Sequence, residues 1–88
     1  MKFLVNWKPA AQDELAAAWV AADSAGRRAI RVASHAIDTR LANDPQTAGE
    51  SRPRKRRIIF ALPLAVIFQV HEADRRVDVL TVQLLPRR

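Results

Sequence analysis

The chain has 88 residues, a mean hydropathy of −0.16, a net charge of +6 and no cysteine. A single domain over residues 1–88 is expected, because so short a chain cannot build two cores. Disulfide frameworks and thiolate metal sites are excluded, and the charge favours an anionic partner such as nucleic acid, an acidic protein or an anionic surface.

The N-terminal segment KFLVNW predicts a short strand with Phe3, Val5 and Trp7 on one face. Pro9 suits the first turn of a helix, because the N–H that proline lacks has no partner there. The alanine-rich stretch that follows favours that helix. Its apolar stripe, which we expect to face the core, consists of Ala11, Leu15, Ala18, Trp19 and Ala22.

A second helix is predicted from Ala25 to about Ala42, with Asp23 or Ser24 as its N-cap. Its expected core positions are Ala29, Ile30, Ala33, Ile37 and Leu41. The turn-forming stretch NDPQTAGE ends it. The two helices are thus predicted to form an antiparallel hairpin.

The next stretch, SRPRKRR, is densely cationic. Residues 1–50 hold six bases and six acids, whereas residues 51–88 hold nine bases and three acids, so the whole positive excess lies in the second half. The cations of the run are Arg52, Arg54, Lys55, Arg56 and Arg57. A solvated loop and a contact surface for phosphates or an acidic partner are both open, and the charge density favours contact. An extended backbone would place Arg52, Arg54 and Arg56 on one surface.

Three segments with period-two alternation then predict consecutive strands, RRIIFAL, LAVIFQV and RVDVLTVQLL. Their short connections predict an antiparallel meander. The uncharged run IIFALPLAVIFQV has thirteen residues, fewer than the roughly 20 that a membrane span needs, and Pro63 interrupts it. We therefore expect a soluble, cytoplasmic protein that does not enter a membrane.

Few side chains are candidates for chemistry. His71, at the mouth of the last turn, suits proton transfer near neutrality, but the sequence favours its interpretation as a polar turn residue. His35, between apolar neighbours, is interpreted as structural, and Glu50 as a loop charge or a base beside the cations. The aromatic residues all fit core positions: Phe3, Trp7, Trp19, Phe60 and Phe68. We expect no metal and no cofactor.

The order of strand, two helices and three strands resembles the RelE/ParE superfamily of toxins from bacterial toxin–antitoxin pairs. The features that carry the resemblance are the opening strand ending near Trp7, PAAQDELAAAW on the first helix, AIDTRLANDPQTAG closing the second, the basic segment, PLAVIFQV and RVDVLTVQ. It implies an α+β fold of order β-α-α-β-β-β, with an antiparallel sheet packed on a helical hairpin.

The resemblance also implies a function and partners. Ribonuclease members cut mRNA in the ribosome by attack of a ribose 2′-hydroxyl on the neighbouring phosphate, whereas other members inhibit DNA gyrase without cutting RNA. Either kind is held inactive by a cognate antitoxin, here expected to be acidic in its binding segment. A degenerate member without toxicity is a third reading.

The ribonuclease members carry basic residues before and on the second strand, an arginine on the third, and an arginine with a tyrosine or histidine near the C-terminus. The basic run matches the first group, and Arg87 or Arg88 matches the C-terminal arginine. Ala65 stands near the third-strand position, and the chain has no tyrosine. The catalytic set is therefore incomplete, with Lys55, His71 and Arg87 as candidates. The expected nucleic-acid or antitoxin contacts are Arg52, Arg54, Lys55, Arg56, Arg57, Arg87 and Arg88.

Overall fold

A computed structural model describes residues 2–86 of the chain. Its elements are β1 (Leu4–Trp7), α1 (Pro9–Ala21), α2 (Ser24–Asn43), β2 (Glu50–Arg52), β3 (Arg56–Ala61), β4 (Leu64–His71) and β5 (Arg76–Leu84). The predicted order is confirmed, with one addition. The short strand β2 lies inside the basic segment, where no separate strand was expected.

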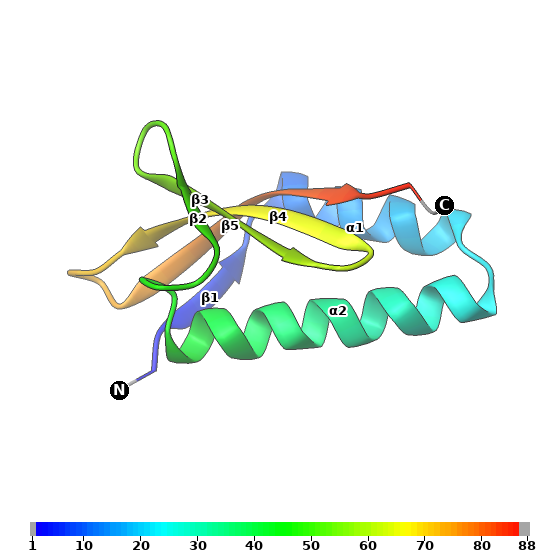
Figure 1. The fold of residues 1–88 in the computed structure, drawn as a ribbon, viewed down its shortest axis with the longest axis horizontal. Helices are drawn as coiled ribbons and strands as arrows, with labels where there is room; N and C mark the ends of the chain where they lie inside the picture. Colours follow the sequence, from blue (N-terminus) through cyan, green and yellow to red (C-terminus); the bar gives the residue numbers. More distant parts are fainter. Residues whose placement is uncertain (1, 87–88) are drawn as a thin grey trace.

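The five strands form one sheet in the order β1-β5-β4-β3-β2 (Figure 1). Strands β3, β4 and β5 form the predicted antiparallel meander. Strand β1 pairs with β5 in parallel, with Leu4 opposite Arg76 and Trp7 opposite Val79. The sheet is therefore mixed rather than wholly antiparallel. The reason is that β1 and β5 come from opposite ends of the chain, and no local pattern records their relative direction.

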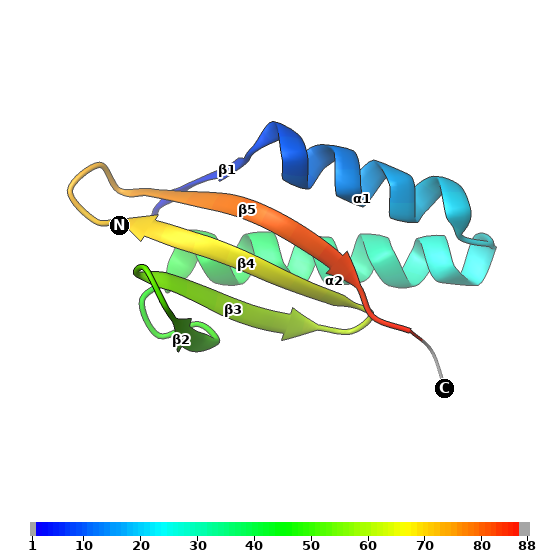
Figure 2. The same ribbon diagram turned by 90° about the horizontal axis from the view of Figure 1, so that it is seen from above.

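Helix α2 lies against one face of this sheet, α1 lies along the edge at β5, and the other face is open. Figure 2 shows the sheet in front of α2, with α1 alongside β5 and β1. Side chains from both layers meet between them in a dry core, whose largest members are Phe68, Ile30, Ile37, Leu41, Leu64, Val66, Val77 and Val79. Burial of this apolar surface is the main force that holds the helices against the sheet. Within residues 2–86, no helix is long and apolar enough to span a membrane.

Most of the predicted stripes face the core, with two exceptions. Ala11 and Ala18 of α1 are buried, but Trp19 remains 36% exposed and the expectation that it belongs to the core is wrong. The Arg27 guanidinium covers its ring, 5.7 Å from the centroid, and Arg27 Nε donates to the Trp19 carbonyl at 2.9 Å. On α2, Ala29 is exposed although it was assigned to the core stripe. Both lie near the turn between the helices, Trp19 toward the end of α1 and Ala29 in the second turn of α2.

Two carboxylates accept hydrogen bonds from backbone amides that would otherwise have no partner in the fold. The Asp23 side chain accepts from the Gly26 amide at 2.8 Å and caps α2, as predicted. Strand β5 extends beyond the end of β1, and there Glu14 of α1 accepts from the Val82 amide at 2.8 Å. This contact protects an exposed strand edge, which would otherwise present an unpaired donor.

Candidate nucleic-acid interface

The basic run forms a hairpin rather than a continuous extended segment. Arg52 of β2 pairs with Arg56 of β3, and Pro53, Arg54 and Lys55 make the connection. Arg54 and Lys55 both have positive φ, 64° and 62°, which matches the φ pattern of a type I′ turn. The predicted alternation of side chains across the run is therefore interrupted at the turn. Figure 1 shows this hairpin rising from the sheet on the side away from the helices.

Arg57 of the run is used by the protein itself. Arg57 points toward the helix side of the sheet and binds the loop that enters β2. Its Nε donates to the Ala48 carbonyl at 2.9 Å, and its two terminal nitrogens donate to the Ser51 hydroxyl at 3.0 Å and the Gly49 carbonyl at 3.1 Å. The same loop requires glycine at position 49, because φ is +65° and a Cβ there would lie 1.9 Å from the Ile58 carbonyl oxygen.

A small cationic pocket lies at the base of the hairpin. Its volume is about 250 Å³, and it is lined by Gln46, Ser51, Arg52, Lys55, Arg56, Arg57 and Val70. The pocket thus brings together four of the predicted contact residues, namely Arg52, Lys55, Arg56 and Arg57. Glu50 is exposed and pairs with Arg52 at 3.4 Å, which partly neutralises the cation nearest to it. The pocket offers guanidinium and ammonium donors at a size that suits a phosphate group.

The open face of the sheet carries a polar row across four strands. Arg56 lies opposite Gln69, Gln69 opposite Asp78, and Asp78 opposite Asn6. Residues paired in this way present their side chains on the same face of a sheet. In the adjacent row His71 lies opposite Arg76. The cationic hairpin and the polar rows thus lie at the same end of the molecule, where Figures 1 and 2 both place the β2–β3 hairpin beside the end of β4.

His71 and Asp78 are in direct contact within this polar group. The Nε2 of His71 lies 3.1 Å from Oδ2 of Asp78, and Asp78 is the single buried polar side chain of the described residues, with 6% exposed. Its other oxygen accepts from Asn6 Nδ2 and Arg76 Nε, each at 3.1 Å. Although burial acts to raise the pKa of Asp78, these hydrogen bonds and the nearby positive charges hold it below its usual range. Asp78 is therefore a carboxylate at neutral pH.

On β3 and β4, the other half of the open face is apolar. Alternation along β3 places Ile58 and Phe60 on the same face as Arg56. Phe60 is 53% exposed, so its assignment to the core is wrong. The reason is that β3 buries Ile59 and Ala61 against the helices, which turns its neighbours outward. Phe3 and Phe68 are buried as predicted, and Trp7 packs against the core while donating to Asp38 Oδ1 at 3.0 Å.

The remaining predicted site residues that the structure describes lie outside the cationic pocket and the polar rows. Ala65, at the position where an arginine was sought, faces the open side and is 5% exposed. His35 is exposed on α2 rather than packed among apolar neighbours. Arg87 and Arg88 lie outside the described residues. Within residues 2–86, no group of three or more His, Cys, Asp or Glu side chains is placed to hold a metal ion.

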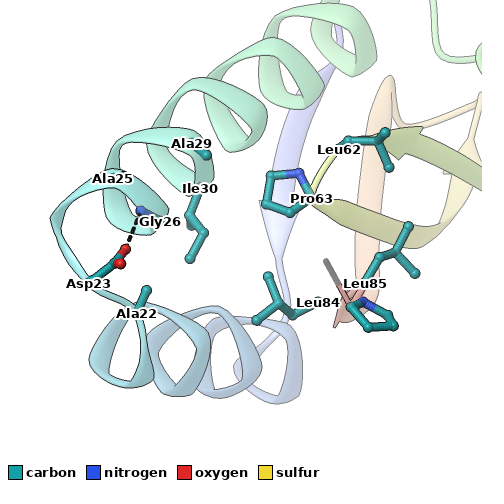
Figure 3. A pocket seen from close by; sticks show the side chains of 11 residues that line it. Ala22, Asp23, Ala25, Gly26, Ala29, Ile30, Leu62, Pro63, Leu84 and Leu85 are labelled. Carbon is teal, nitrogen blue, oxygen red and sulfur yellow. Dashed lines mark hydrogen bonds between the residues drawn. The ribbon is translucent and has the colours of Figure 1, made fainter. Parts of the chain in front are cut away.

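A larger and mainly apolar pocket lies at the opposite end of the molecule. It has a volume of about 850 Å³ and lies between the turn of the helices, the β3–β4 turn and the end of β5 (Figure 3). Pro63 and Leu84 point toward Ile30 from the sheet side, whereas the side chains of Leu62 and Leu85 extend away from the helices. Among the described residues of its lining, the only charged side chain is Asp23, which is occupied as a helix cap. This pocket suits apolar side chains rather than phosphates.

Comparison with solved structures identifies the architecture. One chain of the toxin–antitoxin complex RelBE2 from Mycobacterium tuberculosis superposes with a TM-score of 0.78 at 13% identity, over 96% of this chain and 92% of that one. The chromosomal ParDE toxin–antitoxin system of P. aeruginosa gives 0.76 at 16% identity, over 96% and 97%. This chain has the RelE/ParE fold. The isolated E. coli RelE toxin shares that fold with a TM-score of 0.59 at 14% identity, over 98% and 87%.

The RelE/ParE fold was thus expected from the element order, although sequence comparison alone does not find it. No protein-family model matches the chain, and no curated protein is significantly similar to it in sequence. Sequence reasoning also missed Asn6, Arg76 and Asp78 as site residues. The signal for two of them was present: the four-residue connection between β4 and β5 sets Arg76 opposite His71 and Asp78 opposite Gln69. Asn6 gave no such signal, because its contact is made across 72 residues of sequence.

Proposed function

We propose that the protein is the toxin of a type II toxin–antitoxin pair in the bacterial cytoplasm, and that it inhibits translation by ribosome-dependent cleavage of mRNA. The observation that carries the proposal is the composition of the open sheet face. There Arg56, the exposed ring of Phe60 and the His71–Asp78 pair share one surface, beside the cationic β2–β3 hairpin.

These side chains are the types that bind single-stranded RNA. Guanidinium groups contact phosphates, and an exposed aromatic ring stacks on a base, which is worth about 1–3 kcal/mol per base. The cations of the hairpin extend this surface, and Arg54 and Lys55 are both exposed at its tip. RNA that lies along β3 would therefore meet phosphate-binding and base-stacking groups on the same face.

The antitoxin is the second proposed partner. A disordered acidic segment that folds over the hairpin would neutralise Arg52, Lys55 and Arg56 and block access of RNA to the open face. The neighbouring structures are described as toxin–antitoxin complexes, which supports a partner of this kind. Binding would also stabilise a small chain by mass action. Co-purification with the product of an adjacent acidic reading frame, lost at high salt, is the test.

A second candidate function is inhibition of DNA gyrase without RNA cleavage. The observation in its favour is Ala65, a small and nearly buried residue where ribonuclease members are expected to carry an arginine. One fewer cation on the open face weakens stabilisation of the phosphorane charge during cleavage. The fold neighbours include both RelE and ParE types, so the fold is compatible with either function.

The deciding experiment is expression of the chain alone in a bacterial host, with mapping of mRNA 5′ ends and measurement of plasmid supercoiling. We expect growth arrest with new mRNA ends that need translating ribosomes. The triple variant Arg54→Ala, Lys55→Ala and Arg56→Ala should lose both effects. Arg28→Ala with Arg31→Ala is the matched control, because these exposed cations lie on α2, away from the open face.

Each outcome assigns a function or removes one. Arrest with intact mRNA and altered supercoiling supports gyrase as the target and refutes RNA cleavage. Cleavage that survives in the triple variant would show that the hairpin is not the RNA contact. Absence of arrest at high expression would refute the toxin assignment for this member of the fold.

A further inference from the structure

His71 combines three properties that a proton-transfer residue needs. It carries an imidazole, the side chain that most often transfers protons in general acid–base catalysis. It is partly accessible, with 32% of its side chain exposed on the open face. Its orientation is fixed by Asp78, whose Oδ2 lies 3.1 Å from Nε2. A histidine with only a structural role would not need all three properties at once.

The contact also fixes which nitrogen is available. In the neutral ring, Nε2 carries the proton and donates it to the Asp78 carboxylate, so Nδ1 is the basic nitrogen. None of the hydrogen bonds among residues 2–86 engages Nδ1. Asp78 cannot turn away from His71 easily, because Asn6 and Arg76 hold its other oxygen. The imidazole is therefore presented in one tautomer.

Two guanidinium groups lie near the same position. Arg76 lies opposite His71 in the β4–β5 pairing and donates to Asp78 and to Asp74, the latter at 3.3 Å. Arg56 lies across Gln69 from Asp78 in the next row. A phosphodiester attracted by these guanidinium groups would place an adjacent ribose near the imidazole.

We propose that His71 is a catalytic residue that accepts the proton of a ribose 2′-hydroxyl in single-stranded RNA, and that Asp78 is the positioning residue that orients it. This inference rests on the proposed ribonuclease function and names the residue that acts as its general base. It assigns RNA rather than DNA as substrate, because DNA has no 2′-hydroxyl to deprotonate.

The step balances without a metal or a second substrate. The 2′-hydroxyl proton passes to Nδ1 of His71, and the O2′ electron pair forms a bond to the neighbouring phosphorus. The bond from phosphorus to the 5′-oxygen of the next nucleotide breaks, and that oxygen leaves with the electron pair and takes a proton from water. The products are a 2′,3′-cyclic phosphate and a 5′-hydroxyl end, and His71 returns its proton to the solvent.

The test uses the whole chain with ribosomes programmed with an mRNA that the wild type cleaves. His71→Ala should lower the single-turnover cleavage rate by about a hundredfold or more, the usual contribution of a general base. Its affinity for the same RNA with 2′-deoxyribose at the scissile nucleotide should stay within about twofold of wild type. His35→Ala, which removes the other histidine from an exposed site on α2, should cleave at the wild-type rate.

Two further measurements separate catalysis from folding. Added imidazole should restore part of the cleavage by His71→Ala, which it cannot do for a misfolded protein. Asp78→Asn should lower the rate with unchanged RNA affinity, because an amide no longer selects the tautomer with a basic Nδ1. Thermal unfolding of each variant shows whether the fold is intact.

The failures are distinguishable. If the wild type cleaves and His71→Ala cleaves equally fast, the proposal for His71 is overturned and the ribonuclease function stands. A 5′-phosphate on the downstream product has the same meaning, because it excludes attack by the 2′-oxygen. If the wild type cleaves no mRNA on the ribosome, the proposed function fails, and the role of His71 fails with it.

Discussion

The amide of Asn6 donates to the carboxylate of Asp78 at 3.1 Å and thereby joins the first strand to the last, 72 residues later in the sequence. The contact lies on the open face, where Leu4–Trp7 and β5 run in parallel. It places a buried carboxylate at the centre of the polar group and restrains it from one side. The geometry around His71 thus depends on a pairing between the two ends of the chain.

The first prediction concerns pH and Asp78. Its folded-state pKa is held below its usual range, in spite of burial, by hydrogen bonds from Asn6 and Arg76. The carboxylate therefore stabilises the fold above its unfolded-state pKa of about 4, and this contribution is lost as pH falls through the folded-state pKa. Asp78→Asn should lower the free energy of unfolding by about 1–3 kcal/mol near pH 5.

Urea unfolding of both proteins from about pH 5 to about pH 2 measures this effect, since linkage to the shared carboxylates cancels in the difference. We expect the stability gap between wild type and Asp78→Asn to narrow as the pH falls. A gap that is constant over this range would mean that Asp78 titrates alike in the folded and unfolded chains.

The second prediction separates Arg57 from the other cations of the run. Arg57→Ala removes three hydrogen bonds to the loop that enters β2 and should cost about 1–3 kcal/mol of stability, measured by urea unfolding. Arg57→Lys should not rescue it, because an ammonium group cannot reproduce the planar fork of a guanidinium. Arg54→Ala is the control, and an equal loss there would contradict a special role for Arg57.

The third prediction uses the turn of the β2–β3 hairpin. Arg54 and Lys55 hold positive φ, which costs side chains of this kind about 1 kcal/mol or more each. Replacing them with Asn and Gly, the residues that such turns favour, should raise the free energy of unfolding by about 1 kcal/mol.

The same double variant should bind RNA more weakly, because it removes two cations. Titration of a single-stranded RNA at several salt concentrations checks this, with the log–log slope expected to fall by about 0.7 for each lost phosphate contact. A variant that is more stable and binds as tightly as wild type would show that the turn cations do not contact RNA.

The fourth prediction concerns Phe60. Because its ring is 53% exposed, Phe60→Ala should change the stability of the protein by less than about 0.5 kcal/mol. RNA affinity should fall by about 1–3 kcal/mol, the value of one base stacked on an aromatic ring. Leu62→Ala is the matched control, an exposed apolar residue of the β3–β4 turn that borders the apolar pocket. Equal losses of affinity in both variants would exclude stacking on Phe60.

Much of the fold follows from local sequence patterns. Period-two alternation located β3, β4 and β5, and the buried positions Ile30, Ala33, Ile37 and Leu41 follow the predicted stripe of α2. These patterns work because each strand or helix must bury one face, and its neighbours along the chain record which one. The cationic segment could also be located from the sequence, because the number of charged residues in a segment does not depend on the fold.

Other features needed the tertiary structure. The outward position of Phe60 depends on which face of β3 the helices cover, and an isolated strand pattern with apolar residues on both faces does not reveal that. The hydrogen bonds from Arg57 to the Ala48 and Gly49 carbonyls depend on the path of the loop that enters β2. The meeting of Asn6, His71 and Asp78 depends on a parallel pairing between the ends of the chain. The sequence by itself therefore determined the elements and their charge, whereas long-range pairing decided which side chains meet, because contacts between distant segments arise only when the core is assembled.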